Sequence, residues 1–220
     1  MISAVGHDLR APLTVIRGAA TLLLQTQGEL EPGRAAEMLR LIDGQVELMN
    51  DRIEDMLAIA ALDAGQLRLS HERLALEELV TALGAWAAKR DGGTRVSVRA
   101  DPDLSPRGDP GPVLEGDPDR VLQCLRALVR NALRHCPGDS PIEVSMVADG
   151  TGGVCFRVHD RGPGLPSQVT PFQRFQSGGS GAGLGLDLVR GLVVAMGGEV
   201  AYEARPGGGS ALSFTLGGHA

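Results

Sequence analysis

The sequence predicts an α+β protein in which an N-terminal antiparallel helical hairpin is followed by an α/β sandwich. Two long segments with apolar residues at helical spacing occupy the first part of the chain, and shorter strand and helix patterns fill the rest. Because these strands and helices do not alternate strictly, they favour a mixed sheet with helices on one face. We expect two domains, residues 1–65 and 70–220.

The hairpin follows from two amphipathic patterns. In residues 2–27 apolar side chains recur every three or four positions, and Pro12 is expected to bend this helix. After a break at residues 28–33, a second pattern with a near-heptad seam covers residues 38–60. A lone hairpin would leave its apolar stripe exposed, so we expect two copies to pair into a four-helix bundle.

The second domain is predicted from shorter patterns that follow a linker near residues 63–70. Residues 101–118 are rich in Pro, Gly and Asp, which predicts turns and loop. Strands are expected at residues 67–74, 94–99, 142–148, 154–160, 199–204 and 210–216, and helices at 76–88, 119–135 and 184–196.

Composition excludes several classes of protein. The chain has 21 Lys and Arg against 27 Asp and Glu, a formal net charge of -6, which argues against a nucleic-acid surface. Cys124, Cys136 and Cys155 have no CxxC spacing, so neither a disulfide framework nor a zinc site is expected. The longest apolar stretches are too short for a membrane helix. We therefore expect a cytoplasmic location.

His7 and Asp8 are the first candidates for chemistry. A neutral histidine on a helix surface offers a ring nitrogen as nucleophile, and an adjacent carboxylate orients the ring or takes its proton. A solvated pair is the simpler interpretation of these two residues alone. However, the run from Val5 to Thr14, VGHDLRAPLT, resembles the phospho-acceptor motif of bacterial two-component sensor histidine kinases. The resemblance implies that His7 accepts the γ-phosphoryl group of ATP and that Asp8 assists.

A second motif lies in the predicted helix at residues 119–135. Its end, LRALVRNALRH, resembles the asparagine box of the same family. The resemblance implies that Asn131 coordinates Mg²⁺, for which an amide oxygen is a suitable hard ligand, and that Arg134 and His135 lie at the phosphates. A polar residue on an amphipathic helix would be the alternative.

Two glycine-rich motifs follow in the order that the family requires. VHDRGPGL resembles the DxGxG box, which implies that Asp160 accepts a hydrogen bond from the adenine amino group beside Gly162 and Gly164. GAGLGL resembles the second glycine box, in which a loop enters a helix and exposed amides favour phosphate. Its ligand-binding positions would be Gly181, Gly183, Leu184 and Gly185. Between the two boxes, PFQRF resembles the phenylalanine box, although packing alone would also explain Phe172 and Phe175.

Together these resemblances cover nearly the whole chain. They imply a dimerisation and phospho-acceptor domain joined to a GHKL-type ATPase domain, using ATP and Mg²⁺. The expected partners are a second copy of the chain and a response regulator receiver domain whose aspartate takes the phosphoryl group. Only six residues precede His7. We expect a missing sensor region, through which an inner-membrane protein would reach the membrane.

Two substitutions depart from the family pattern. Ala11 stands where many relatives carry a Thr or Asn that positions water for dephosphorylation, so weak phosphatase activity is expected. Ala127 replaces an asparagine that relatives often carry one turn before Asn131, so weaker magnesium or lid contacts are expected. Two alternatives stay open: another enzyme of the ATPase superfamily, such as an anti-sigma serine kinase or a chaperone-like ATPase, and a scaffold that binds nucleotide or a partner helix without turnover.

Overall fold

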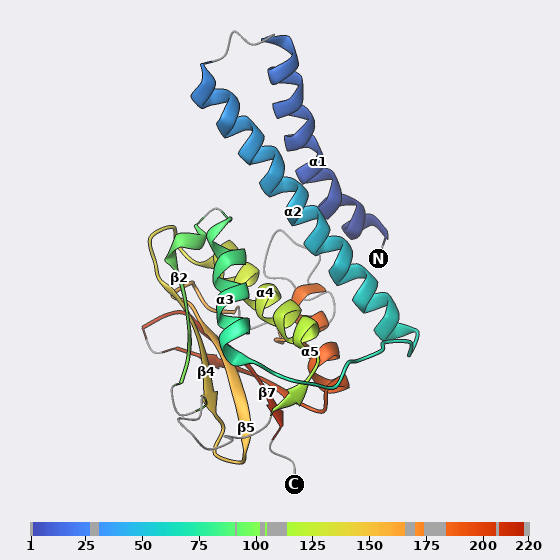
Figure 1. The fold of residues 1–220 in the computed structure, drawn as a ribbon, viewed down its shortest axis with the longest axis vertical. Coiled ribbons are helices and arrows are strands. Elements are labelled where there is room, and N and C mark those ends of the chain that lie inside the picture. Colours follow the sequence, from blue (N-terminus) through green and yellow to red (C-terminus); the bar gives the residue numbers. More distant parts are fainter. Residues whose placement is uncertain are drawn as a thin grey trace.

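The computed structural model describes residues 2–26, 31–90, 92–101, 104, 114–165, 170–173, 184–205 and 207–217, without the side chains of residues 2–5, 7, 8 and 32. A two-helix hairpin projects from a layered domain, and the second half of the second helix runs across that domain (Figure 1). This is the α+β arrangement that the sequence predicts. The helices are α1 Ile2–Gln25, α2 Pro32–Asp63, α3 Leu76–Ala88, α4 Pro118–His135 and α5 Leu184–Ala195, with a 3-10 turn η1 Gly93–Arg95.

The strands form two sheets. The main sheet has five strands in the order β2-β4-β5-β7-β6, in which only the β2 and β4 pair is parallel. A second, two-stranded sheet joins β1 and β3. The strands are β1 Glu72–Arg73, β2 Val96–Ala100, β3 Glu115–Gly116, β4 Ile142–Ala148, β5 Gly153–His159, β6 Glu199–Ala204 and β7 Ser210–Gly217.

The predicted hairpin is confirmed. Helix α1 runs through Pro12, and α2 begins with Pro32 in its first turn, where a missing backbone N–H costs nothing. Residues 28–30 of the predicted break at 28–33 lie outside the described part of the chain, and the break was predicted too long, because α2 already begins at Pro32. No helix among the described residues is long and apolar enough to cross a membrane.

One strand prediction was wrong in extent. The alternation in residues 67–74 predicted a strand, but only Glu72–Arg73 pairs, with β3. The reason is that neighbouring backbone groups have other partners, since Ser70 N donates to the Asp117 carboxylate at 3.0 Å. The predicted strands of the main sheet hold to within a residue or two, and β2 begins at Val96 because η1 precedes it.

Helix α4 is the element whose sequence best explains its ends. Asp117 caps its first turn by accepting a hydrogen bond from the backbone N of Arg120 at 3.0 Å, and Pro118 follows at the first helical position. The basic residues Arg134 and His135 occupy the last turn, where the partial negative charge of the helix favours cations. These local signals place the residues of the asparagine box at the C-terminal end of α4.

The core lies between the main sheet and the layer formed by α3, α4 and α5. Phe156 of β5 and Phe214 of β7 are register partners whose rings stack with centroids 4.7 Å apart. Both are almost fully buried, and side chains such as Leu125, Leu128 and Leu188 cover them from the helices. The side chains of Cys124, Cys136 and Cys155 are buried as free thiols. This core fixes the sheet and α4 relative to each other, and with them the two halves of the site described next.

Candidate functional site

The end of α4 presents three polar side chains on its outer surface. Ala132 is fully buried against the sheet, whereas Asn131 is half-buried and Arg134 and His135 are exposed. Within the described part of the chain, no hydrogen bond occupies the side chain of Asn131. Its amide is therefore available to a ligand.

The turn after β5 holds a buried carboxylate. Asp160 is 4% exposed, and its Oδ1 accepts a hydrogen bond from the backbone N of Gly162 at 2.7 Å. Its backbone N donates to Ser210 O at 2.9 Å, and its carbonyl accepts from Arg205 Nη1 at 3.1 Å. These contacts fix the orientation of the carboxylate, and Oδ2 has no partner among the described residues.

Close backbone packing explains the glycine at position 162. A Cβ there would lie 2.9 Å from the Asp160 carboxylate and 3.1 Å from the carbonyl oxygen of His135. The Asp160 turn therefore touches the last turn of α4. Gly164 has a positive φ of 78°, which an L side chain adopts only with strain. The fold thus brings the first glycine box and the asparagine box together.

The surroundings of His135 change the pKa of its imidazole. Burial lowers the pKa of its imidazole, and the nearby charge of Arg134 lowers it further, whereas Asp160 acts in the opposite direction. The neutral imidazole is therefore favoured in the folded chain. Arg134 also has an interaction partner in the folded chain.

The second glycine box is described only at its helical end. Leu184 and Gly185 begin α5 and are half-buried, whereas Gly181 and Gly183 lie outside the described residues. A Cβ at Gly185 would meet no atom within 4 Å, so the packing of the chain itself does not require glycine there. In the phenylalanine box, Phe172 is 5% exposed and belongs to the hydrophobic core. Arg174 and Phe175 lie outside the described residues.

His7 and Asp8 belong to α1, but their side chains lie outside the described part of the structure. Ala11, one turn further on, is exposed on the same helix. Helix α1 makes extensive contact with α2 alone among the described elements. The structure therefore does not bring His7 and Asp8 together with the residues around Asp160.

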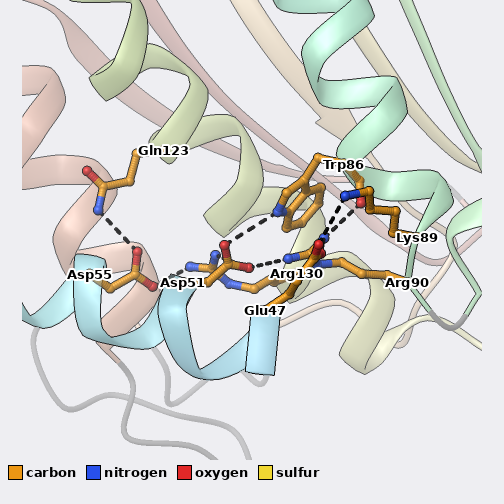
Figure 2. A network of polar contacts seen from close by, with 8 residues as sticks. All are labelled: Glu47, Asp51, Asp55, Trp86, Lys89, Arg90, Gln123 and Arg130. Carbon is orange, nitrogen blue, oxygen red and sulfur yellow. Dashed lines mark hydrogen bonds and ion pairs between the residues drawn. The ribbon is translucent and has the colours of Figure 1, made fainter. Parts of the chain in front are cut away.

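The structure also contains a polar network that the sequence did not predict (Figure 2). Asp51 of α2 accepts hydrogen bonds from Arg90 Nη2 at 2.6 Å and from Trp86 Nε1 at 3.5 Å. Its Oδ2 also lies 3.5 Å from Arg130 Nη1. The guanidinium of Arg90 lies 3.7 Å from the centroid of the Trp86 ring. The network therefore joins α2 to both α3 and α4.

Asp55, one turn further along α2, extends the network. Its carboxylate pairs with Arg130 and accepts a hydrogen bond from Gln123 Nε2 at 3.3 Å. Burial raises the pKa of Asp55, against the lowering effect of Arg130 and Gln123. The cost of removing this carboxylate from water thus outweighs the attraction of its partners, as is common for buried ion pairs. No local sequence pattern predicted that these charged residues are buried, because a charged position on a helix usually faces water.

Comparison with known proteins explains this combination of parts. Residues 1–65 match the His Kinase A (phospho-acceptor) domain, and residues 116–218 match the histidine kinase-, DNA gyrase B- and HSP90-like ATPase. The chain is the catalytic core of a two-component histidine kinase. In this kinase core, the first match covers the hairpin, and the second covers α4, most of the main sheet and α5.

Sequence similarity to known proteins extends over almost the whole kinase core. Signal transduction histidine-protein kinase AfsQ2 of Streptomyces coelicolor is 30% identical over 98% of this chain and 41% of its own length. Sensor protein DivL of Caulobacter vibrioides is 33% identical over 98% of this chain and 27% of its own length. The chain thus spans less than half the length of these curated relatives.

Solved structures share the fold. Full-length ShkA in complex with AMPPNP has a TM-score of 0.63 and 26% identity, covering 97% of this chain and 44% of that one. Histidine kinase AdeS of Acinetobacter baumannii has the same TM-score of 0.63 at 22% identity, covering 96% of both chains. The fold predicted from sequence is therefore that of known histidine kinases.

Proposed function

We propose that the chain uses ATP to phosphorylate His7 and then passes the phosphoryl group to an aspartate of a response regulator. In this proposal residues 1–65 form the dimerisation and phospho-acceptor domain, and residues 70–220 form the ATP-binding domain. The observation that carries it is the contact between the Asp160 turn and the end of α4. This contact joins two motif residues whose sequence positions are far apart.

The proposed nucleotide site uses both sides of this contact. The free Oδ2 of Asp160 is suited to accept a hydrogen bond from the adenine amino group, because Gly162 N holds the other carboxylate oxygen, Oδ1, in place. Phosphate would lie towards the first turn of α5, where helix N–H groups favour anions. The positions assigned to nucleotide are Asn131, Arg134, His135, Asp160, Gly162, Gly164, Gly181, Gly183, Leu184 and Gly185.

The residues at this site fit magnesium bound together with nucleotide. No group of three or more His, Cys, Asp or Glu side chains among the described residues could hold a metal alone. Asn131 offers an amide oxygen, and Mg²⁺ is commonly completed by phosphate and water. When bound, the ion would offset the negative charge of the phosphates. We assign Asn131 as its ligand from the protein.

The proposed reaction is an in-line phosphoryl transfer. A ring nitrogen of His7 attacks the γ-phosphorus, so an N–P bond forms while the bond from phosphorus to the β,γ-bridging oxygen breaks. ADP leaves with that electron pair, and Asp8 takes or orients the proton of the imidazole. Arg134 supports the phosphates, because such transfers depend mainly on positioning and charge.

A second copy of the chain is the proposed partner for the hairpin. Large apolar side chains remain exposed on both of its helices, although each packs against the other. Pairing of two hairpins into a four-helix bundle would remove these side chains from water. They include Leu13, Leu22 and Leu24 on α1 and Leu39, Leu41, Ile53 and Leu57 on α2. We also propose a cytoplasmic location, with any membrane attachment supplied by a sensor region outside this chain.

Labelling with γ-³²P-ATP and Mg²⁺ tests the proposed activity. The chain is expected to acquire label that is lost in acid and kept in base, as phosphohistidine is, and the His7→Gln variant is expected to acquire none. Ser3→Ala, a change in the same helical region, is the matched control. Label that survives acid would indicate a serine kinase, and nucleotide binding without any label would indicate a scaffold.

The proposed weak phosphatase activity has its own test. Replacing Ala11 with Thr adds a hydroxyl that can hold water near His7, so dephosphorylation of the phosphorylated regulator should become several-fold faster. The release of phosphate from the isolated phosphoregulator is measured with each chain and ADP present. Robust dephosphorylation by the unaltered chain would contradict the proposal.

A further inference from the structure

Glycines occupy two of the six positions in the loop that follows β5, residues 160–165. Pro163 restricts its own backbone, but Gly164 has a positive φ of 78°, and glycine has more conformational freedom than any other residue. The proposed contact with adenine depends on the Asp160 carboxylate, and hydrogen bonds weaken steeply when their geometry changes. The loop therefore needs support from other parts of the chain to hold this carboxylate in place.

Arg205 supports the beginning of this loop. It directly follows β6, and its half-buried side chain donates from Nη1 to the carbonyl oxygen of Asp160 at 3.1 Å. The backbone N of Asp160 donates to Ser210 O at 2.9 Å, and Arg205 N donates to Gly209 O at 3.1 Å. Both backbone polar groups of Asp160 are thus bound to the hairpin formed by β6 and β7.

Tyr202 supports the other end of the loop. It is the register partner of Leu212, and its ring packs against the hydrophobic core. Its hydroxyl oxygen accepts a hydrogen bond from Leu165 N at 3.2 Å, and a Cβ added at Gly164 would lie 3.7 Å from the same oxygen. A phenylalanine would fill the same space in the core, so the hydroxyl group is the part of Tyr202 that serves the loop.

The two supports come from the same end of one strand. Strand β6 ends at Ala204, between Tyr202 and Arg205. In the main sheet β7 separates β6 from β5, and the two contacts with the loop join residues 37 and 45 positions apart. The end of β6 therefore holds the loop at both of its ends, although none of its residues belongs to the motifs of the proposed nucleotide site.

We propose that Tyr202 and Arg205 are positioning residues that hold residues 160–165 so that the Asp160 carboxylate selects adenine over other bases. They act through the backbone groups of Asp160 and Leu165 and do not touch the nucleotide. This inference rests on the proposed assignment of Asp160 to adenine.

Calorimetric titration of the complete chain with ADP and with IDP tests this selection. The base of IDP has a carbonyl oxygen where adenine has its amino group, so it cannot donate to Asp160 there. Neither nucleotide has a γ-phosphoryl group, so no transfer accompanies binding. The unaltered chain is expected to prefer ADP. Tyr202→Phe and Arg205→Met should each lower the ratio of ADP affinity to IDP affinity about threefold to tenfold, the effect of one lost hydrogen bond.

The conservative variant Arg205→Lys keeps a donor for the Asp160 carbonyl, so it should retain more of the ADP preference than Arg205→Met. The matched control is Arg157→Met. Arg157 is another half-buried arginine of the main sheet, and its Nη2 lies 3.8 Å from Cys155 Sγ. Its replacement should leave the ratio of the two affinities unchanged.

Amide hydrogen exchange measures the support of the loop without nucleotide. Leu165 N–H donates to Tyr202, so it should exchange faster with solvent in the Tyr202→Phe variant. Unchanged exchange at Leu165 would overturn the role of the hydroxyl group.

The affinity ratio separates positioning from stability. Equal losses of ADP and IDP affinity, as general destabilisation would produce, would overturn the inference, and so would a full ADP preference in both Tyr202→Phe and Arg205→Met. In either case the preference of the unaltered chain would still support the proposed nucleotide site. An unaltered chain that binds ADP and IDP equally would instead contradict the assignment of Asp160 to adenine, and the inference would fall with it.

Discussion

Replacing Asp160 with asparagine is expected to weaken ATP binding about 10- to 100-fold, the range that corresponds to loss of a hydrogen bond to a charged group. The carboxylate is buried and fixed through Oδ1, which accepts from Gly162 N at 2.7 Å. Asparagine has the same size and keeps one acceptor for Gly162. Its amide NH₂ would then face the adenine amino group, so two donors would oppose each other. Isothermal titration with a non-hydrolysable ATP analogue measures the change.

Asp149→Asn is the matched control for this substitution. Asp149 also accepts hydrogen bonds from backbone N–H groups, those of Thr151 and Gly153, but it lies in the turn between β4 and β5. Its replacement should leave ATP affinity unchanged. Equal affinity of the Asp160→Asn variant and the unaltered chain would contradict the assignment of Asp160 to adenine.

Replacing Gly209 with alanine is expected to lower the free energy of unfolding by about 2–5 kcal/mol, through backbone strain and overpacking. Gly209 has a φ of +109°, and a Cβ there would lie 2.2 Å from the carbonyl oxygen of Asp160. The added Cβ and the carbonyl oxygen of Asp160 are both fixed to the backbone, so no side-chain rotation can separate them. The start of β7 and the Asp160 turn would have to separate. Urea unfolding followed by circular dichroism measures the loss.

Gly207→Ala separates strain from collision. Gly207 also has a positive φ, of +81°, but a Cβ there would meet no atom within 4 Å. It should cost only about 1–2 kcal/mol, the strain of a left-handed alanine. In the absence of denaturant, ATP affinity should fall for the Gly209→Ala variant and not for the Gly207→Ala variant. Equal stability of the two variants would show that the Asp160 turn tolerates displacement.

Local patterns in the sequence were sufficient for most elements of the fold. The apolar spacing in α1 and α2, the capped start of α4 and the alternation in β4 each involve neighbouring residues, so periodicity predicts them. The segment at residues 67–74 shows where this fails. Leu67 and Leu69 alternate as in a strand, but pairing requires a partner strand, and the backbone of Ser70 binds a side chain distant in sequence.

The sequence predicted the individual residues of the candidate site, but not how these residues contact one another. Four motifs in the family's order predict His7, Asn131, Asp160 and the glycines of the second box as site residues. The contact of Gly162 with the end of α4 required the folded chain, because it joins two backbones that no periodic pattern relates.

By itself, the sequence determined the fold class, the order of the elements and the kinase motifs, since these depend on local spacing and on residue type. Only the tertiary structure decided which face of α2 meets the ATP-binding domain. Asp51 pairs with Arg90, 39 residues away in the sequence, and Asp55 pairs with Arg130, 75 residues away. In the sequence they have the pattern of a solvated helix face. The physical reason is that a charge on a helix carries no local sign of whether water or a distant guanidinium will neutralise it.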